Sequence, residues 1–365
     1  MSDSGEIKII KLFSPDFNNK EISAAVNTIK SGNWASGSGI NNVKKFEEHF
    51  KKNTNSKTCI AVDSGSSALE LALSLFNLKN KEVLVPSFTF ISTINSIIFN
   101  GAKPIFVDIE PETLNLDPID LEKKITKKTK MILPVHFGGL PINIKNIKKI
   151  AKKNNLLLIT DAAHACGAKI DKQKIGSEAD CVCFSFHPVK NLAMPKGGAI
   201  TINLKNYKKY EKISKSLRWC GIDNRKNVKY DVPRLGHNFY MDEISASIGI
   251  IQLKKLESMN KKRYLIAKKY FNQINLEKKM PLVKGCSYHL YWIISEKRDK
   301  LRDFLYSKNI ETGIHYQPAH KMSLYKTKIK LPITEEISKK IITLPMHTNL
   351  TKKNIEYVIK MVNSF

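Results

Sequence analysis

The sequence predicts an α/β fold, with a large domain built on a mostly parallel, mixed sheet flanked by helices and a smaller C-terminal α+β domain. Three observations lead to this prediction. Strand-like apolar segments alternate with helical ones through roughly the first 200 residues. A long stretch with apolar residues at helical spacing follows, and from about Gly285 strand-like and helical segments are mixed. The length of 365 residues accommodates both domains.

Seven segments of the first part have the composition of buried strands. The helix expected between the first two has Leu69, Ala72, Leu73 and Phe76 on one face. Most of the other strands are also separated by helical stretches, which is the arrangement that joins parallel strands. In chain order the strand segments are TCIAVDS, EVLVPSF, KPIFVDI, MILPVHF, LLLITDA, CVCFSF and GGAITIN.

The remaining elements follow from a change of periodicity. The segment DEISASIGIIQLKKLESMNKKRYLIAKKYFNQI predicts long helices. After Gly285 we expect a strand in YHLYWIISE, a helix in KRDKLRDFLYSKN, the segment TGIHYQPAH and a final helix. We therefore divide the chain into a large domain, residues 1–260, and a small domain, residues 261–365.

The charge of the chain first suggests a nucleic-acid partner. The net charge is +28, but the lysines are spread in pairs along the expected helices and are not gathered beside aromatic residues. This pattern favours a solvated basic surface, and we expect no nucleic-acid partner. No apolar run approaches the roughly 18 residues of a membrane span. The segment MSDSGEIKII has no secretory signal pattern, so we expect a cytoplasmic protein without a membrane partner.

The six cysteines are dispersed and predict free thiols. Cys181 and Cys183 are separated by one residue, which is not the spacing of a zinc or redox hairpin. No cysteine and histidine cluster has the spacing of metal ligands. We expect no metal site.

Small hydroxyl residues precede the first helix of the α/β part. The segment DSGSSALELAL places Ser64 to Ser67 at the helix start. Free amide groups and the helix dipole at such a terminus can hold a phosphate, with the Ser66 or Ser67 hydroxyl as a further donor. Ordinary N-capping by serine explains the same residues, so both interpretations stay open here.

An acid and an amine follow two of the expected strands. Asp161 ends LLLITDA, and Ser185, His187 and Lys190 follow CVCFSF. The carboxyl ends of strands in open α/β sheets are where ligands bind. A lysine that forms an imine, a carboxylate and a phosphate site together are what pyridoxal phosphate requires. Taken singly, Asp161 could instead cap a helix, and Lys190 could face solvent.

Ordered motifs along nearly the whole chain carry a resemblance to a known family. The chain resembles the DegT/DnrJ/EryC1/StrS sugar aminotransferases, which depend on pyridoxal phosphate, have the fold-type I architecture of aspartate aminotransferase and work as homodimers. The motifs are SGNWASGSGINNVKKFEEHF, DSGSSALELAL, VPSFTFISTINSIIFNGAKPIFVDIEPETLNLDP, TKMILPVHFGG, DAAHACGA, FSFHPVKN, GIHYQPAH and TLPMH.

The resemblance assigns roles to individual residues. It makes Lys190 the lysine that bonds to the cofactor and later carries the proton, and Asp161 the partner of the pyridinium nitrogen. His164 falls near the ring hydroxyl, and Phe90 falls where an aromatic side chain stacks on the ring. The residues that it assigns to the phosphate are Gly65, Ser66, Ser185 and, from the neighbouring subunit, Asn238.

Two residues depart from the family pattern on the substrate side. Lys196 stands where a glutamate commonly precedes the paired glycines, and Tyr240 stands where an arginine is frequent. These changes put the identity of the acceptor in doubt, not the cofactor. A related dehydratase branch has histidine in place of the lysine, and Lys190 argues against that branch.

The resemblance implies an aminotransferase that moves an amino group from an amino acid, glutamate in our expectation, to a keto group of a nucleotide-linked deoxysugar. Such a reaction makes precursors of cell-surface polysaccharides or glycans. Two alternatives remain: the same chemistry on a small phosphorylated carbonyl compound, and a regulatory protein that kept the fold without the activity. Residues that could hold the diphosphate or sugar are Arg218, Tyr240, His315, Tyr316 and His320; surface charge or loop packing explains these residues equally well, so both interpretations stay open.

Overall fold

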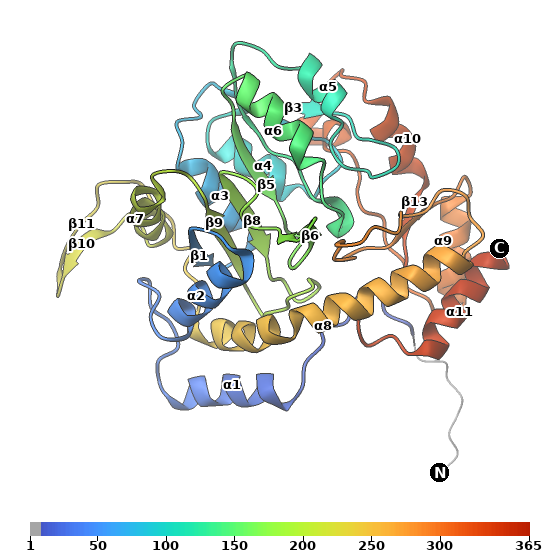
Figure 1. Ribbon diagram of the computed structural model, residues 1–365, viewed down its shortest axis with the longest axis horizontal. Helices are drawn as coiled ribbons and strands as arrows, with labels where there is room; N and C mark the ends of the chain where they lie inside the picture. Colours follow the sequence, from blue (N-terminus) through green and yellow to red (C-terminus); the bar gives the residue numbers. More distant parts are fainter. Residues whose placement is uncertain (1–8) are drawn as a thin grey trace.

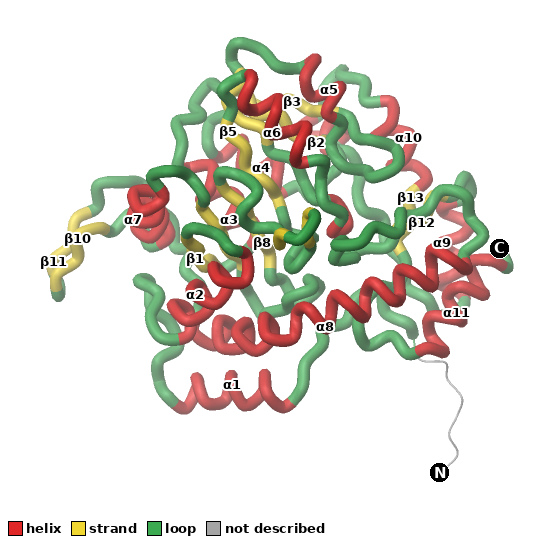
Figure 2. Tube along the Cα trace, viewed as in Figure 1, coloured by secondary structure: helices red, strands yellow, loops and turns green. Residues whose placement is uncertain are grey.

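The computed structural model describes residues 9–365, in which a central sheet is enclosed by helices (Figures 1 and 2). The seven strands are ordered β1-β9-β8-β5-β4-β2-β3. β9 pairs antiparallel with β1 and β8, and the other pairs are parallel. The strands are β1 (Thr58–Val62), β2 (Glu82–Pro86), β3 (Lys103–Val107), β4 (Thr129–Ile132), β5 (Leu157–Asp161), β8 (Cys181–Ser185) and β9 (Gly198–Ile202). All seven predicted strands are confirmed.

Eight helices belong to this part of the chain, and they pack on both faces of the sheet or around it. They are α1 (Asn19–Lys30), α2 (Asn42–Thr54), α3 (Gly65–Ser74), α4 (Ser92–Phe99), α5 (Pro118–Lys123), α6 (Ile144–Lys153), α7 (Tyr207–Arg218) and α8 (Glu243–Gln273). Two small hairpins also occur, β6 (Lys169–Ile170) with β7 (Gln173–Lys174), and β10 (Asp223–Lys226) with β11 (Lys229–Asp231).

Alternation of side chains along the strands produces two cores. In β8, Val182 and Phe184 join the core that contains α2, α5, α6 and the first half of α8, whereas Cys181 and Cys183 face the core of α3, α4 and α7. Successive side chains of a strand point to opposite faces, so each strand can be buried on both sides. This is why the strands appear in the sequence as continuous apolar runs.

The C-terminal part forms a third core around a two-stranded sheet. Its elements are β12 (Trp292–Ile294), α9 (Arg298–Ser307), α10 (Pro332–Lys340), β13 (Ile341–Thr343) and α11 (Lys352–Asn363), with 3-10 turns at Ala319–Lys321 and Ser323–Tyr325. A further 3-10 turn, Phe137–Gly139, lies between β4 and α6. The strand predicted in YHLYWIISE is limited to three residues, which pair with the three residues of β13, and Tyr288 before it has a positive φ of 45°.

α8 is one continuous helix of 31 residues that extends from the first core to the third (Figure 1). Met259 packs in the core of the sheet, whereas Ile266 and Tyr270 pack in the C-terminal core. The domain boundary that we predicted after residue 260 therefore falls inside this helix, where the packing partners change and the chain does not break.

Five of the six cysteines are buried, Cys220 is exposed, and all six are free thiols. Within residues 9–365, no helix is both long enough and apolar enough to cross a membrane. The same residues contain no group of three or more His, Cys, Asp or Glu side chains arranged to hold a metal ion.

Candidate active site

A cavity of about 350 Å³ lies where the parallel strands of the sheet end. Residues that follow β1, β2, β4, β5 and β8 line it, and one segment of the C-terminal part closes one side. This is the edge at which open α/β sheets bind ligands. The predicted site residues that it brings together are Gly65, Ser66, Phe90, Asp161, His164, Ser185, Lys190, Lys196, His315 and Tyr316.

Lys190 follows β8 in a tight turn and is half-buried in this cavity. Its backbone amide donates to the His187 carbonyl at 2.7 Å, which fixes the turn. Burial disfavours the charged amine and lowers its pKa from 10.5 to about 8, although the nearby Asp161 carboxylate opposes the shift. An amine with this pKa is neutral in an appreciable fraction of molecules near neutral pH, so it can act as a nucleophile or base.

Asp161 ends β5 and is buried, with both carboxylate oxygens bonded. Oδ1 accepts from the Ala163 amide at 2.9 Å, and Oδ2 accepts from the Thr93 hydroxyl at 2.8 Å. Burial raises the pKa of Asp161, whereas these two bonds and the Lys190 charge lower it. Sequence analysis missed Thr93, which lies three residues after Phe90 in a motif that we quoted without assigning it a role.

The start of α3 forms one wall of the cavity. The Ser64 hydroxyl accepts from the Ser67 amide at 3.1 Å, so the N-capping interpretation is correct for Ser64. The amides of Gly65 and Ser66, in the first turn, have no acceptor within the helix. A Cβ atom at Gly65 would lie 2.6 Å from the Ser185 Cβ atom, so only glycine lets these two segments approach. The N-terminus of α3 is therefore capped by Ser64, and the amides of Gly65 and Ser66 remain available at the cavity.

His164 and Tyr316 meet on the opposite side. The Gly138 amide donates to His164 Nδ1 at 3.3 Å, so Nε2 carries the proton in the neutral ring and donates to the Tyr316 oxygen at 3.1 Å. Burial keeps the pKa of His164 well below its usual value. The Tyr316 hydroxyl proton is thus left to donate elsewhere. The Phe90 ring, 6.0 Å from the Tyr316 ring, is 56% exposed at the cavity.

The structure adds His289, which sequence analysis did not single out. Its Nε2 atom lies 3.5 Å from the Lys190 amine, and the ring is buried. The residue belongs to the SYHLYWI stretch, which we interpreted only as a strand; it lies just before β12. The histidine within an apolar run was the signal available in the sequence.

Two predicted substrate residues do not line the cavity, and their expected role is corrected. Arg218 is fully buried, and its guanidinium donates to Glu47 at 2.7 Å and to the Ala61 carbonyl at 2.9 Å. It therefore ties α2 to β1. His320 is also fully buried, with Nδ1 2.7 Å from the Ser87 hydroxyl and Nε2 3.2 Å from a Glu335 oxygen. Neither side chain is free to hold a diphosphate in this cavity.

Two further predicted residues lie outside the cavity of their own chain. Asn238 is exposed and pairs with Trp219 in an isolated β-bridge, and Tyr240 pairs similarly with Val62. Lys196, the other departure from the family pattern, does line the cavity, and its amine pairs with an Asp63 oxygen at 2.8 Å. The lysine that departs from the family pattern is therefore held in an ion pair at the cavity.

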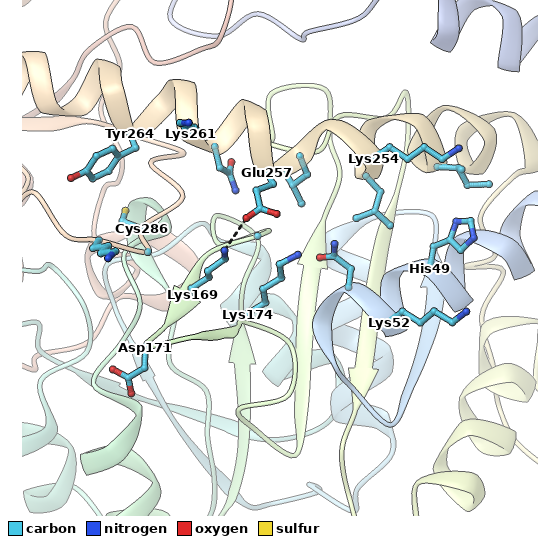
Figure 3. A pocket seen from close by; sticks show the side chains of 18 residues that line it. His49, Lys52, Lys169, Asp171, Lys174, Lys254, Glu257, Lys261, Tyr264 and Cys286 are labelled. Atoms are coloured by element: carbon cyan, nitrogen blue, oxygen red, sulfur yellow. Dashed lines mark hydrogen bonds and ion pairs between the residues drawn. The ribbon is translucent and has the colours of Figure 1, made fainter.

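A larger cavity of about 980 Å³ lies elsewhere, between α2, the β6–β7 hairpin and α8 (Figure 3). It shares no residue with the first cavity. Of the two acids that line it, Glu257 pairs with Lys169 at 3.0 Å. The residues that line this larger cavity include no amine and buried carboxylate arranged like Lys190 and Asp161, so its greater volume does not make it the active site. Its basic residues are His49, Lys52, Lys169, Lys174, Lys254, Lys261 and Lys284.

The residues of the smaller cavity fit pyridoxal phosphate. Lys190 supplies an amine that can bond to the aldehyde, and Asp161 supplies a buried carboxylate for the ring nitrogen. The amides of Gly65 and Ser66 with the Ser185 hydroxyl provide donors suited to a phosphate. No arrangement of metal ligands is required for this chemistry.

Comparison with known proteins agrees with this fit. The model of the DegT/DnrJ/EryC1/StrS aminotransferase family matches residues 15–363. GDP-perosamine synthase of Escherichia coli O157:H7 is 33% identical, with 98% of this chain and 99% of that protein covered. The dTDP-3-amino-3,6-dideoxy-alpha-D-galactopyranose transaminase of Aneurinibacillus thermoaerophilus is 35% identical, with 95% of each covered.

A solved structure shows the same fold with cofactor. Spr1654 of Streptococcus pneumoniae, in its pyridoxal phosphate form, superposes with a TM-score of 0.92 at 26% identity, with 98% of each chain covered. The predicted fold-type I architecture is thereby confirmed. The family match over nearly the whole chain, together with these relatives, makes the assignment: the chain belongs to the DegT/DnrJ/EryC1/StrS aminotransferase family of pyridoxal-phosphate enzymes.

Proposed function

We propose that the protein transfers an amino group from an amino acid, with glutamate as the donor, to a keto group of a nucleotide-linked deoxysugar, with Lys190 as the proton carrier. The observation that carries the proposal is the Lys190 amine, half-buried and with a pKa of about 8, in one cavity with the buried Asp161 carboxylate. A surface lysine would be protonated at neutral pH and could not remove a proton.

Each residue of the proposed site has its own role in the reaction. Bound pyridoxal phosphate supplies a ring that accepts the electron pair left when the α-proton is removed. Lys190 removes that proton from the donor and returns it at the neighbouring atom. Asp161 would face the ring nitrogen, and the hydrogen bonds from Thr93 and the Ala163 amide favour its ionised form against the effect of burial. The start of α3 and Ser185 would hold the phosphate.

Two features support a nucleotide sugar as the acceptor. GDP-perosamine synthase and the dTDP-sugar transaminase act on sugars linked to a nucleoside diphosphate, by their names, and each matches this chain over at least 95% of its length. Lys196 lines the same cavity as His315 and Tyr316, with its amine paired to an Asp63 oxygen. A diphosphate is the part of such a substrate that a lysine would attract.

We also propose that the active unit is a homodimer whose sites are built from both chains. Asn238 is exposed and lies outside the cavity of its own chain. The β10–β11 hairpin extends from the body of the molecule at the left of Figure 1, and apolar side chains on and beside it face solvent. Val228 is 87% exposed and Leu235 is 93% exposed. A second copy that covered this region would bury them.

The visible spectrum of the purified protein tests the proposed reaction. We expect a cofactor absorbance that glutamate bleaches and that a ketosugar nucleotide restores. Lys190→Ala should abolish turnover, whereas Lys174→Ala in the larger cavity should leave both the spectrum and turnover unchanged. Turnover of a small phosphorylated ketone in place of every ketosugar nucleotide would contradict the proposed acceptor. Turnover by Lys190→Ala at the rate of the unmodified protein would contradict the role of that lysine.

A further inference from the structure

We propose that His289 is a positioning residue for Lys190: its ring is held neutral with the proton on Nδ1, so that the bare Nε2 atom accepts a hydrogen bond from the lysine amine. The proposal rests on the assignment of Lys190 as the proton carrier. The two atoms, Lys190 Nζ and His289 Nε2, are 3.5 Å apart. Three structural steps lead to the direction of this bond.

The first step fixes the orientation of the Asn191 amide. Asn191 Nδ2 lies 2.7 Å from the Ser287 carbonyl oxygen, which can only accept, so this atom must be the amide nitrogen. The same nitrogen donates to Asn260 Oδ1 at 2.9 Å, and Asn260 in turn donates to the Cys166 carbonyl at 3.0 Å. The Asn191 oxygen therefore faces His289.

The second step fixes the tautomer of the ring. The Asn191 oxygen lies 3.2 Å from His289 Nδ1 and has no proton to donate. Nδ1 must carry the hydrogen of this contact. In a neutral imidazole the other nitrogen is then a bare acceptor, and this nitrogen is the one beside Lys190. The tautomer is opposite to that of His164, whose proton lies on Nε2.

The third step excludes the charged ring. Burial lowers the pKa of His289 well below its usual value, and the neighbouring Lys190, His164, Arg263 and His315 lower it further. Phe13 stacks on the ring with centroids 5.5 Å apart and planes 13° from parallel, and the His164 ring lies 4.4 Å away. This packing resists rotation of the imidazole, so the acceptor stays directed at the lysine.

The bond acts on both states of Lys190. When the amine is neutral and donates one hydrogen to His289, its lone pair points away from the imidazole, which restricts the directions from which it can take a proton. When the amine has become an ammonium, Nε2 accepts from it and stabilises the charge. His289 keeps its own proton throughout, because Nδ1 already holds one and a second would create a buried cation.

Matched substitutions of His289 test the proposal in the cofactor-free protein. His289→Phe keeps an aromatic ring against Phe13 but removes the acceptor, whereas His289→Gln keeps an amide oxygen near Lys190. Lys190 modification by an amine-reactive reagent, followed by mass spectrometry against pH, reports the pKa of its amine. We expect His289→Phe to lower this pKa and His289→Gln to restore most of it. His347→Phe, which removes a buried histidine outside the cavity, is the control and should leave it unchanged.

The loaded enzyme gives a second measurement. Loss of a hydrogen bond to a charged group should slow α-proton removal from glutamate by about 10-fold in His289→Phe, with partial recovery in His289→Gln. Equal pKa values of Lys190 in the unmodified protein and in His289→Phe would overturn the proposal. Equal pKa values of Lys190 in His289→Phe and in His289→Gln would also overturn the proposal.

A spectroscopic measurement on the unmodified chain reports the tautomer of His289 directly. Nitrogen-15 spectra of labelled histidines distinguish a protonated from a bare ring nitrogen, and the His289 signals can be assigned by their loss in His289→Gln. We expect a protonated Nδ1 and a bare Nε2; a protonated Nε2 would overturn the proposal. Turnover by Lys190→Ala at the rate of the unmodified protein would instead refute the proposed function, whatever the state of His289.

Discussion

Replacement of Thr93 by valine tests how Asp161 is kept ionised. The substitution preserves the shape of the side chain and removes the hydroxyl that donates to Asp161 Oδ2 at 2.8 Å. A hydrogen bond to a buried charge contributes about 1.5–3 kcal/mol, and about 1.4 kcal/mol corresponds to a tenfold change in rate. Asp161 keeps its bond from the Ala163 amide. We therefore expect α-proton removal to slow by about 10-fold, and by no more than about 100-fold.

The sign of the pH dependence follows from the same bond. Thr93 lowers the pKa of Asp161, so its loss raises that pKa and leaves less carboxylate at acidic pH. The deficit of Thr93→Val should accordingly be larger at acidic pH than at alkaline pH. Single-turnover bleaching of the cofactor absorbance by glutamate measures the rate at each pH.

Two further variants separate the effect on Asp161 from loss of stability. Thr93→Ser keeps the hydroxyl and should retain the rate. Thr160→Val removes an equally buried hydroxyl, bonded to Glu178 at 2.9 Å, and should lower the melting temperature without slowing the half-reaction. A half-reaction in Thr93→Val at the unmodified rate and with an unchanged pH profile would refute the reasoning.

Three other expectations concern the lysine, the interface and the basic cavity. The rate at which cofactor-free protein takes up pyridoxal phosphate should rise with pH and level off above about 8, the pKa of Lys190, because only the neutral amine attacks; a rise that continues toward 10.5 would show an ordinary lysine. When an equal mixture of Lys190→Ala and Asn238→Trp proteins is refolded, about a quarter of the sites should become active. Half of the dimers are then mixed, and each mixed dimer has one intact site. Mixed dimers without activity would rule out a shared site. Affinity for random-sequence duplex DNA should fall steeply between about 50 and 200 mM salt. Replacement of Lys52, Lys174 and Lys254 by glutamate should weaken this binding further. Tight, sequence-selective binding at physiological salt would instead indicate a regulatory protein.

The local features of the fold could be predicted from the sequence. A strand buried on both faces needs a short continuous apolar run, and each of the seven runs became a strand. Asp161 and Lys190 could be brought together for a related reason: Asp161 ends one strand, Lys190 follows the next, and parallel strands end at one edge. The continuity of α8 past residue 260 was missed, because nothing in a helical pattern indicates where its packing partners change.

Contacts between distant segments could not be predicted in this way. Arg218 looked available for a substrate because its partner Glu47 is 171 residues away in the sequence. His289 is 99 residues from Lys190, and its role depends on the orientation of Asn191, which tertiary contacts alone determine. A charged or polar residue in a short motif shows its chemistry but not its neighbours, and burial decides whether that chemistry faces a ligand or the protein interior.

The pairing of β1 with β9 has a consequence for synthesis of the chain on the ribosome. Val62 pairs with Gly198 and Thr58 with Ile202, so β1 lies at the sheet margin next to β9, about 140 residues downstream. At about 5–20 residues per second, roughly 7–28 s pass between the synthesis of the two strands. During that interval the apolar segment Thr58–Val62 has no native strand to bind, so it stays open to pairing with other chains until β9 has been made.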